Sequence, residues 1–153
     1  MQTSEPVIRI SVRDQRLDLL LGGAVLASYP VSTSRFGLGS EEGSRKTPLG
    51  KFKIGEKIGD GLPIGTVFRG RIPLRPEDAT PPTDDLILSR ILWLEGLEEH
   101  NANTRDRYIY IHGTNHEEEI GRPASHGCIR MRNTDLVALF DRVPPGAEVR
   151  IET

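Results

Sequence analysis

The sequence predicts a mostly β fold with one or two helices. Its 153 residues include 16 glycines and 11 prolines, and only 5% are aromatic, a composition typical of many turns and strands rather than of a helical bundle. Several segments alternate apolar and polar residues, as half-buried strands do. A single segment near the C-terminus shows the clear period of an amphipathic helix.

The N-terminal part predicts a β-meander. Residues 7–12 alternate apolar and polar side chains, and residues 16–21 repeat this pattern with leucines on one face. Gly22-Gly23 then separates this run from residues 24–31. Two glycines between alternating runs favour a tight hairpin turn, so we expect consecutive antiparallel strands.

The next segment predicts a long surface loop followed by a strand. Residues 32–45 are rich in glycine, serine and charge. The basic pair Arg45-Lys46 leads into Thr47-Pro48-Leu49-Gly50, after which Phe52 and Ile54 alternate with lysines. Residues 51–54 are therefore expected to be extended.

The middle of the chain is irregular. Residues 55–65 carry turn residues, and residues 66–72 predict a short strand. Residues 73–85 hold four prolines and several acids, which indicates a loop, interpreted as a flap over a site. Residues 86–94 predict a long strand, with a helix over residues 91–97 as the alternative.

The C-terminal part predicts a strand, a helix and a closing strand. Residues 108–112 are β-branched and aromatic, and Gly113 ends them. The helix is indicated by apolar residues at helical spacing, with Asn133 or Thr134 as the N-cap and Pro144-Pro145 as the stop. These apolar residues are Leu136, Leu139, Phe140 and Val143. Residues 149–151 form the closing strand.

Length, charge and termini restrict the class of protein. Residues 1–153 are expected to form one domain, long enough to bury a core without disulfide bonds or a structural metal. A formal net charge of -2 argues against nucleic acid or an anionic membrane as the main partner. Residues 1–6 lack the basic and apolar regions of a secretory signal peptide, so we expect a cytoplasmic protein, or a periplasmic one if the chain is trimmed. One cysteine allows no internal disulfide, and the oligomeric state is left open.

Cys128 and His112 are the candidate reactive pair. Cys128 is the single cysteine, and an imidazole beside a thiol raises the thiolate fraction. His112 ends a strand-like run, a rigid support, whereas His126 lies only two residues from the thiol. Gly127 permits a positive φ that would aim backbone N–H groups at an oxyanion. An inert, buried cysteine is the alternative.

A zinc site and a papain-like protease are the alternatives to this pair. His112 and His116 have the spacing of a zinc-binding helix, and Glu117 to Glu119 follow them. The run before His112 is extended, however, which would place the two rings about 13 Å apart. A papain-like protease has its cysteine before its histidine, the reverse of the order here. No metal or other cofactor is therefore expected.

Three motifs carry a resemblance to a known family: Thr47-Pro48-Leu49-Gly50, His112-Gly113-Thr114 and Ser125-His126-Gly127-Cys128-Ile129-Arg130-Met131. Together they resemble the YkuD family of L,D-transpeptidases. The resemblance implies a β-sandwich or barrel-like catalytic domain with a helix beside the site. It also implies cleavage of the bond between meso-diaminopimelate and D-alanine in peptidoglycan tetrapeptide stems, through a thioester on cysteine.

The resemblance also assigns roles to residues. It makes Cys128 the nucleophile and His112 the general base, with the Gly113 carbonyl as the group that orients the imidazole. It assigns His126 and Gly127 to the oxyanion hole and Ser125 to substrate support.

Two arginines are candidates for the substrate's carboxylate. Arg130 stands where some members of the family have asparagine, and its guanidinium could hold a carboxylate bidentately, with Arg132 as a weaker candidate. The alternative for Arg130 is a pairing with a neighbouring acid that fixes the loop.

The partner implied is a stem peptide or muropeptide, and the acceptor is the open question. Because the chain shows no export segment, we expect water as the acceptor, which would make the protein an L,D-carboxypeptidase of peptidoglycan recycling. The alternative is an L,D-transpeptidase that forms cross-links or attaches proteins to the wall. An inactive stem-peptide-binding module is a third reading, disfavoured because both Cys128 and His112 are present.

Overall fold

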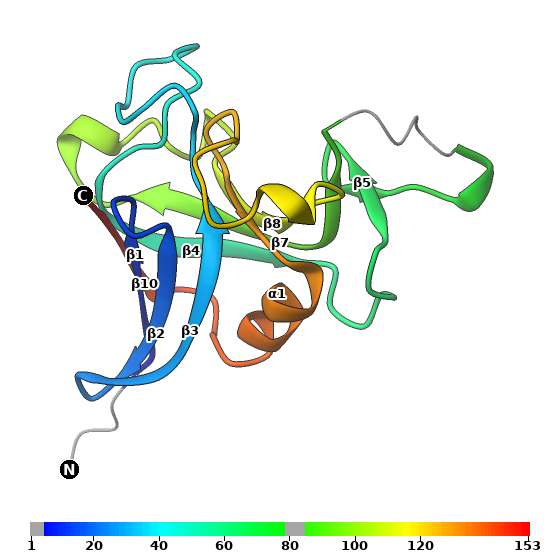
Figure 1. Ribbon diagram of the computed structural model, residues 1–153, viewed down its shortest axis with the longest axis horizontal. Helices are drawn as coiled ribbons and strands as arrows, with labels where there is room; N and C mark the ends of the chain where they lie inside the picture. Colours follow the sequence, from blue (N-terminus) through cyan, green and yellow to red (C-terminus); the bar gives the residue numbers. More distant parts are fainter. Residues whose placement is uncertain (1–4, 79–84) are drawn as a thin grey trace.

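The computed structural model describes residues 5–78 and 85–153, which form a barrel-like β-sheet with one α-helix beside it (Figure 1). The strands are β1 (Val7–Ser11), β2 (Arg16–Leu21), β3 (Ala24–Ser32), β4 (Gly50–Ile58), β5 (Val67–Arg69), β6 (Ile72–Pro73), β7 (Ile87–Gly96), β8 (Tyr110–Gly113), β9 (Ile129–Met131) and β10 (Glu148–Glu152). The helix α1 spans Asn133–Phe140, and the short 3-10 helices are η1 (Pro76–Asp78), η2 (Glu99–Asn101) and η3 (Glu117–Glu119). The predicted fold class is confirmed.

Within the described ranges, eight strands close into a ring in the order β4-β10-β1-β2-β3-β9-β8-β7, and β7 pairs back to β4. The ring removes the free sheet edge that an open sheet would expose between β4 and β7. The hairpin of β5 and β6 is attached outside the ring and projects to the right in Figure 1.

The N-terminal meander is confirmed. β1 pairs antiparallel with β2, and β2 pairs antiparallel with β3. Leu21 lies opposite Ala24, which leaves Gly22 and Gly23 as a two-residue turn with φ of 59° and 81°. Positive φ at both positions is what this type of hairpin turn requires, and glycine adopts it without strain.

Strand β7 is bent at Ser89, whose φ is 74°. The register against β8 shifts between Leu88 and Ile91, so the strand changes partner at this point, from β5 to β4. Ser89 is fully buried, and its hydroxyl donates to Asn133 Oδ1 across 2.7 Å. The alternative helix over residues 91–97 does not form, because β7 is hydrogen-bonded on both sides, to β4 and β8.

Helix α1 packs its apolar face against β7 and β8. Leu136, Leu139 and Phe140 are buried in the main core, which is formed largely by the inward residues of the ring. Lys57 donates to the carbonyl oxygens of Phe140 and Val143 at 2.6 and 2.7 Å, and so satisfies groups that the end of a helix leaves free.

Several predicted boundaries were wrong. The N-cap of α1 is Arg132 rather than Asn133 or Thr134, because the Asn133 amide instead donates to Thr114 O and Glu117 Oε2. Strand β8 begins at Tyr110, since Tyr108 has a φ of 56° and lies in a turn.

The predicted strand over residues 66–72 is divided into β5 and β6 by a turn. The proline-rich segment begins with β6 and η1, and its residues 79–84 lie outside the described part of the chain. None of the described helices has the length and apolar character needed to cross a bilayer.

Candidate active site

Cys128 lies directly before β9, next to the backbone of β8. Its Sγ accepts a hydrogen bond from the Tyr110 N–H at 3.3 Å and donates to the Tyr108 carbonyl oxygen at 3.4 Å. The side chain is partly buried and packs against the apolar cluster that contains Trp93 and Tyr110. Burial of the thiol raises the pKa of Cys128 to about 11, so the free protein carries a neutral thiol at pH 7.

His112 is buried on β8, and its tautomer follows from its partner. Nδ1 lies 2.6 Å from the Gly113 carbonyl oxygen. A carbonyl oxygen only accepts, so Nδ1 carries the hydrogen and Nε2 holds the lone pair. Burial lowers the pKa of His112, although the bond to Gly113 opposes this, and the neutral ring is a base at neutral pH.

Parallel pairing of β8 with β9 sets the relation between the thiol and the imidazole. Ile111 lies opposite Ile129 and both point into the main core, so His112 and Cys128, the residues next to them, point to the other face of the sheet. The register places Arg130 opposite His112. Cys128 is therefore diagonal to His112 on the same face, and its thiol bonds the backbone rather than the imidazole.

The loop before Cys128 is fixed by side-chain to backbone bonds. Ser125 is buried and donates its hydroxyl to the Cys128 carbonyl oxygen at 2.6 Å, while the Gly127 N–H donates to Ser125 Oγ at 3.3 Å. Gly127 has a φ of 125°, a conformation that favours glycine. Ser125 is thus placed to support the loop rather than to face a ligand.

Arg130 is buried and paired. Its side chain is 2% exposed, and it contacts Asp85 Oδ2 at 2.6 Å and Glu119 Oε1 at 3.2 Å. Burial alone would raise the pKa of Asp85, but the Arg130 charge and the hydrogen bonds from His126 and Arg130 lower it on balance. This geometry favours the reading in which Arg130 fixes a loop, because two carboxylates already hold its guanidinium.

His126 and Arg132 are both exposed. His126 Nδ1 lies 3.2 Å from Asp85 Oδ2, and its ring is 5.9 Å from that of Phe36. It thus contributes to the same network as Arg130. Arg132 is the N-cap residue of α1, and its side chain makes no cap hydrogen bond.

The residues that make four supporting contacts were not identified from the sequence. Asp85 and Glu119 pair with Arg130, Asn133 donates to Thr114 O, and Tyr110 donates to the thiol. The sequence allows for an acid that pairs with Arg130, but which acid this is depends on contacts between separate loops.

His116 takes part in a separate group of possible metal ligands. Its ligand atom and those of Glu118 and Glu119 lie within 4.8 Å of one another, and this group, found among the described residues, does not include His112. His112 instead bonds the Gly113 carbonyl oxygen through Nδ1. Glu118 is exposed and His116 and Glu119 are partly buried, and exposed acidic groups are common without a bound metal.

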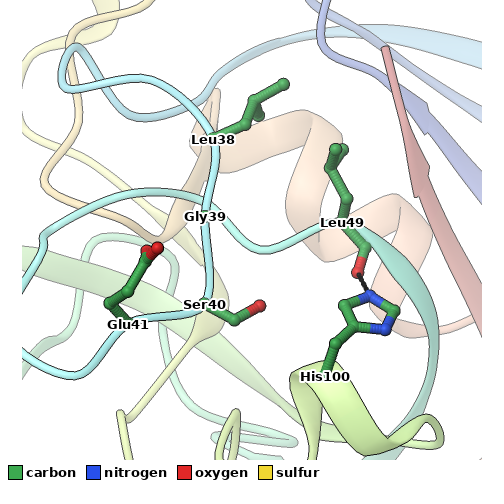
Figure 2. Close-up of a pocket in the computed structure, with 6 residues that line it drawn as sticks. All are labelled: Leu38, Gly39, Ser40, Glu41, Leu49 and His100. Atoms are coloured by element: carbon green, nitrogen blue, oxygen red, sulfur yellow. Dashed lines mark hydrogen bonds between the residues drawn. The ribbon is translucent and has the colours of Figure 1, made fainter.

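A cavity of about 510 Å³ lies elsewhere, between the loop before β4 and η2 (Figure 2). It is lined by Leu38, Gly39, Ser40, Glu41, Leu49 and His100. His100 Nε2 bonds the Leu49 carbonyl oxygen at 3.0 Å, as the figure shows. Neither Cys128 nor His112 lines this cavity, so it is not the site of the thiol.

Comparison with known proteins gives consistent results. A family described as YkuD, L,D-transpeptidase catalytic domain, matches residues 5–151. A Bacillus subtilis protein named L,D-transpeptidase YqjB is 30% identical over 148 residues, which cover 96% of this chain and 71% of that protein. A second B. subtilis protein, named L,D-transpeptidase YkuD, is 29% identical over 94% of this chain and 64% of its own length.

Solved structures show the same fold. L,D-transpeptidase 3 from Mycobacterium tuberculosis, in complex with a faropenem-derived adduct, has a TM-score of 0.65 at 15% identity and is covered over 61% of its length, with 98% of this chain aligned. An L,D-transpeptidase from Xylanimonas cellulosilytica has a TM-score of 0.63 at 20% identity, over 98% of this chain and 61% of that one. This chain therefore spans about three fifths of those structures. Because the family matches residues 5–151, the chain belongs to the YkuD family of L,D-transpeptidase catalytic domains.

Proposed function

We propose that the protein cleaves the bond between meso-diaminopimelate and D-alanine in peptidoglycan tetrapeptide stems, with Cys128 as the nucleophile. Sγ forms a bond to the carbonyl carbon of the third residue, the carbon–nitrogen bond to D-alanine breaks, and a thioester remains on Cys128. The observation that carries the proposal is the pairing of β8 with β9, which puts the only thiol on the same sheet face as a buried, neutral imidazole.

His112 is the proposed general base and acid. Its Nε2 lone pair takes the thiol proton as Sγ attacks and later gives it to the departing D-alanine nitrogen. The proton first has to leave the Tyr108 carbonyl oxygen, so the thiol must rotate toward His112 when substrate binds. The Gly113 carbonyl holds the ring throughout, and it stabilises the imidazolium that forms.

The Cys128 N–H is the proposed oxyanion donor. The Gly127 N–H already donates to Ser125 Oγ in the free protein, and Gly127 instead sets the backbone path that leads to Cys128. A preorganised N–H at a developing oxyanion contributes about 3–4 kcal/mol to the transition state in acyl-transfer enzymes.

We propose water as the acceptor, which makes the protein an L,D-carboxypeptidase that acts on recycled stems in the cytoplasm. His112 takes a proton from the attacking water and gives it to Sγ as the carbon–sulfur bond of the thioester breaks, which releases a tripeptide and restores the neutral thiol. Transfer to an amine is the second candidate, favoured by the relatives that carry the name L,D-transpeptidase. Cell fractionation tests the proposed location.

Product analysis separates the two acceptors. Wild type is incubated with a disaccharide tetrapeptide, with and without a second stem as acceptor, and the products are identified by mass spectrometry. Hydrolysis gives tripeptide and D-alanine in both cases, whereas a transpeptidase gives a cross-linked dimer when the second stem is present. A dimer as the main product would contradict the choice of water.

Variants test the catalytic pair. Cys128→Ala, His112→Ala and the double variant should lose turnover to a similar extent, because groups that act as one unit are not additive. His100→Ala is the matched control, since His100 is an exposed histidine at the cavity of Figure 2. EDTA should leave turnover unchanged. Activity lost in EDTA and restored by zinc would favour a metal site at His116 instead.

A further inference from the structure

Arg71 occupies an unusual backbone position at the tip of the β5–β6 hairpin. Arg69 lies opposite Ile72, so Gly70 and Arg71 form the two-residue turn, with φ of 56° and 71°. Glycine and asparagine are favoured at such positions, and a long side chain there costs conformational energy. Backbone strain that is maintained at a defined position is reason to look for a function of the side chain.

Aromatic rings hold the Arg71 guanidinium in one place. Its Cζ lies 4.6 Å from the centre of the Trp93 ring and 5.2 Å from that of Tyr108. Its Nη1 donates to Tyr110 Oη at 3.0 Å. Stacking and a hydrogen bond fix the orientation of the planar group, so less rotamer freedom remains to be lost when a ligand binds.

Arg71 forms no salt bridge with the acids among the described residues, and the charge of Glu56 acts on it only at longer range. Arg105 stacks on the same indole, with Cζ 4.0 Å from its centre, but it pairs with Glu56 at 2.6 Å. Arg130 is held by two carboxylates. Arg71 is thus a fixed, partly exposed cation whose remaining N–H groups are available to an anion, and a guanidinium matches a carboxylate in geometry.

Tyr110 connects Arg71 to the thiol. Its hydroxyl accepts from Arg71, and its backbone N–H donates to Cys128 Sγ. The guanidinium is therefore separated from Sγ by the length of a tyrosine side chain. A carboxylate bound to Arg71 cannot be the C-terminal carboxylate of D-alanine, because that carboxylate lies only one residue from the attacked carbon. The side-chain carboxylate of diaminopimelate, six bonds from the attacked carbon, has the required reach.

We propose that Arg71 binds the side-chain carboxylate of the third stem residue and so selects diaminopimelate over lysine, which lacks that group. The inference rests on the proposed function, because it assigns a subsite to the same acyl donor. Arg71 stabilises the bound donor before and during attack, so its loss raises KM more than it lowers kcat.

The test compares Arg71→Asn, Arg71→Lys and Arg105→Gln with wild type. Asparagine suits the left-handed turn and removes the cation, so the hairpin is kept. Lysine keeps the charge but loses the planar fork. Arg105→Gln is the matched control, because Arg105 stacks on the same ring and is already paired with Glu56.

Four tetrapeptides are used: one with diaminopimelate, one with its side-chain carboxylate amidated, one with lysine, and one with D-alanine as its C-terminal amide. We expect wild type to prefer the first over the second and third by about tenfold in kcat/KM. Arg71→Asn should abolish this preference, Arg71→Lys should keep part of it, and Arg105→Gln should keep all of it. The discrimination between C-terminal acid and amide should not change in any variant.

Binding to the Cys128→Ala protein gives a readout that does not depend on turnover. Trp93 is the single tryptophan and contacts Arg71, so its fluorescence reports on this subsite. In Cys128→Ala, the added Arg71→Asn change should weaken binding of the diaminopimelate peptide about tenfold and leave binding of the lysine peptide unchanged. The inference would be overturned if Arg71→Asn weakened binding of both peptides equally. It would also be overturned if Arg71→Asn instead removed the preference for the C-terminal acid of D-alanine over its amide. If wild type releases no D-alanine from any peptide, the proposed function itself fails.

Discussion

Thr47 donates its hydroxyl to the Gly127 carbonyl oxygen across 3.0 Å, and 80 residues of chain separate the two. The same hydroxyl accepts from the Ser34 N–H at 2.9 Å, and Thr47 is fully buried. One side chain therefore ties the loop before β4 to the peptide that leads into Cys128. This contact explains why the motif that begins at Thr47 accompanies the motif around the thiol.

Thr47→Val should misplace the thiol as well as weaken the fold. The change keeps the shape but leaves the Ser34 N–H and the Gly127 carbonyl without a partner, which costs about 1–3 kcal/mol each when buried. We expect a lower denaturation midpoint in urea and at least a tenfold loss of kcat. Thr66→Val is the control, because its hydroxyl donates to the Pro63 carbonyl at an exposed site. Equal behaviour of the two variants would argue against a role for Thr47 in the site.

Arg130→Gln should reduce stability rather than substrate discrimination. It leaves Asp85 and Glu119 without their cation, and these side chains are 35% and 30% exposed. We expect the free energy of unfolding measured in urea to fall by about 2 kcal/mol. This is less than the roughly 3–5 kcal/mol that is lost when one partner of a fully buried ion pair is removed.

Arg150→Gln is the control for Arg130, since Arg150 pairs with Glu148 at the surface and such pairs contribute less than about 1 kcal/mol. The hypothesis that Arg130 binds the carboxylate of the substrate makes the opposite prediction. An Arg130→Gln protein of wild-type stability that no longer distinguishes a C-terminal acid from its amide would support that reading.

The pKa of Cys128 predicts how stability changes at alkaline pH. Burial raises this pKa from 9.0 to about 11, so between these values the folded state holds a proton that the unfolded state has lost. Stability should therefore fall as pH rises from about 9 to about 11. Thermal melting across this range should show a larger decrease for wild type than for Cys128→Ala. Parallel curves for the two proteins would mean that the thiol is not shifted in this way.

The lowered pKa of His112 predicts the acidic limit of turnover. The base must be neutral, so activity should persist as pH falls below 6.5, the usual value for histidine, and disappear only at the lower pKa. The pH profile of kcat/KM in the free enzyme measures this limit. An acidic limb above pH 6.5 would contradict the effect of burial on His112.

The sequence predicted the local parts of the fold well. Alternating residues defined β1 to β3, and Gly22-Gly23 defined their turn, because both signals depend on neighbours in the chain. The pairing of β7 with β4 that closes the ring could not be predicted from the sequence. It depends on the bend at Ser89, a non-glycine residue with positive φ. That residues 1–153 form one domain stays a prediction.

The candidate site was predicted by residue type more than by arrangement. Cys128 and His112 were selected from their chemistry, and the structure places them on one sheet face. The ion pairs of Arg130 could not be predicted, because its partners Asp85 and Glu119 come from separate loops, and a role of Arg130 in substrate binding stays a prediction. Arg71 was not singled out, since its place beside Tyr110 depends on the pairing of β5 with β7.

Peptide mapping of the acyl-enzyme tests the central claim, that Cys128 carries the acyl group of the stem. Wild type is mixed with a diaminopimelate tetrapeptide, quenched in acid within one turnover, digested and analysed by mass spectrometry. We predict that the peptide containing Cys128 gains the mass of the tripeptide acyl group, with one equivalent of D-alanine released, and that Cys128→Ala shows neither. An adduct on another residue, or D-alanine released by Cys128→Ala at the wild-type rate, would contradict the account.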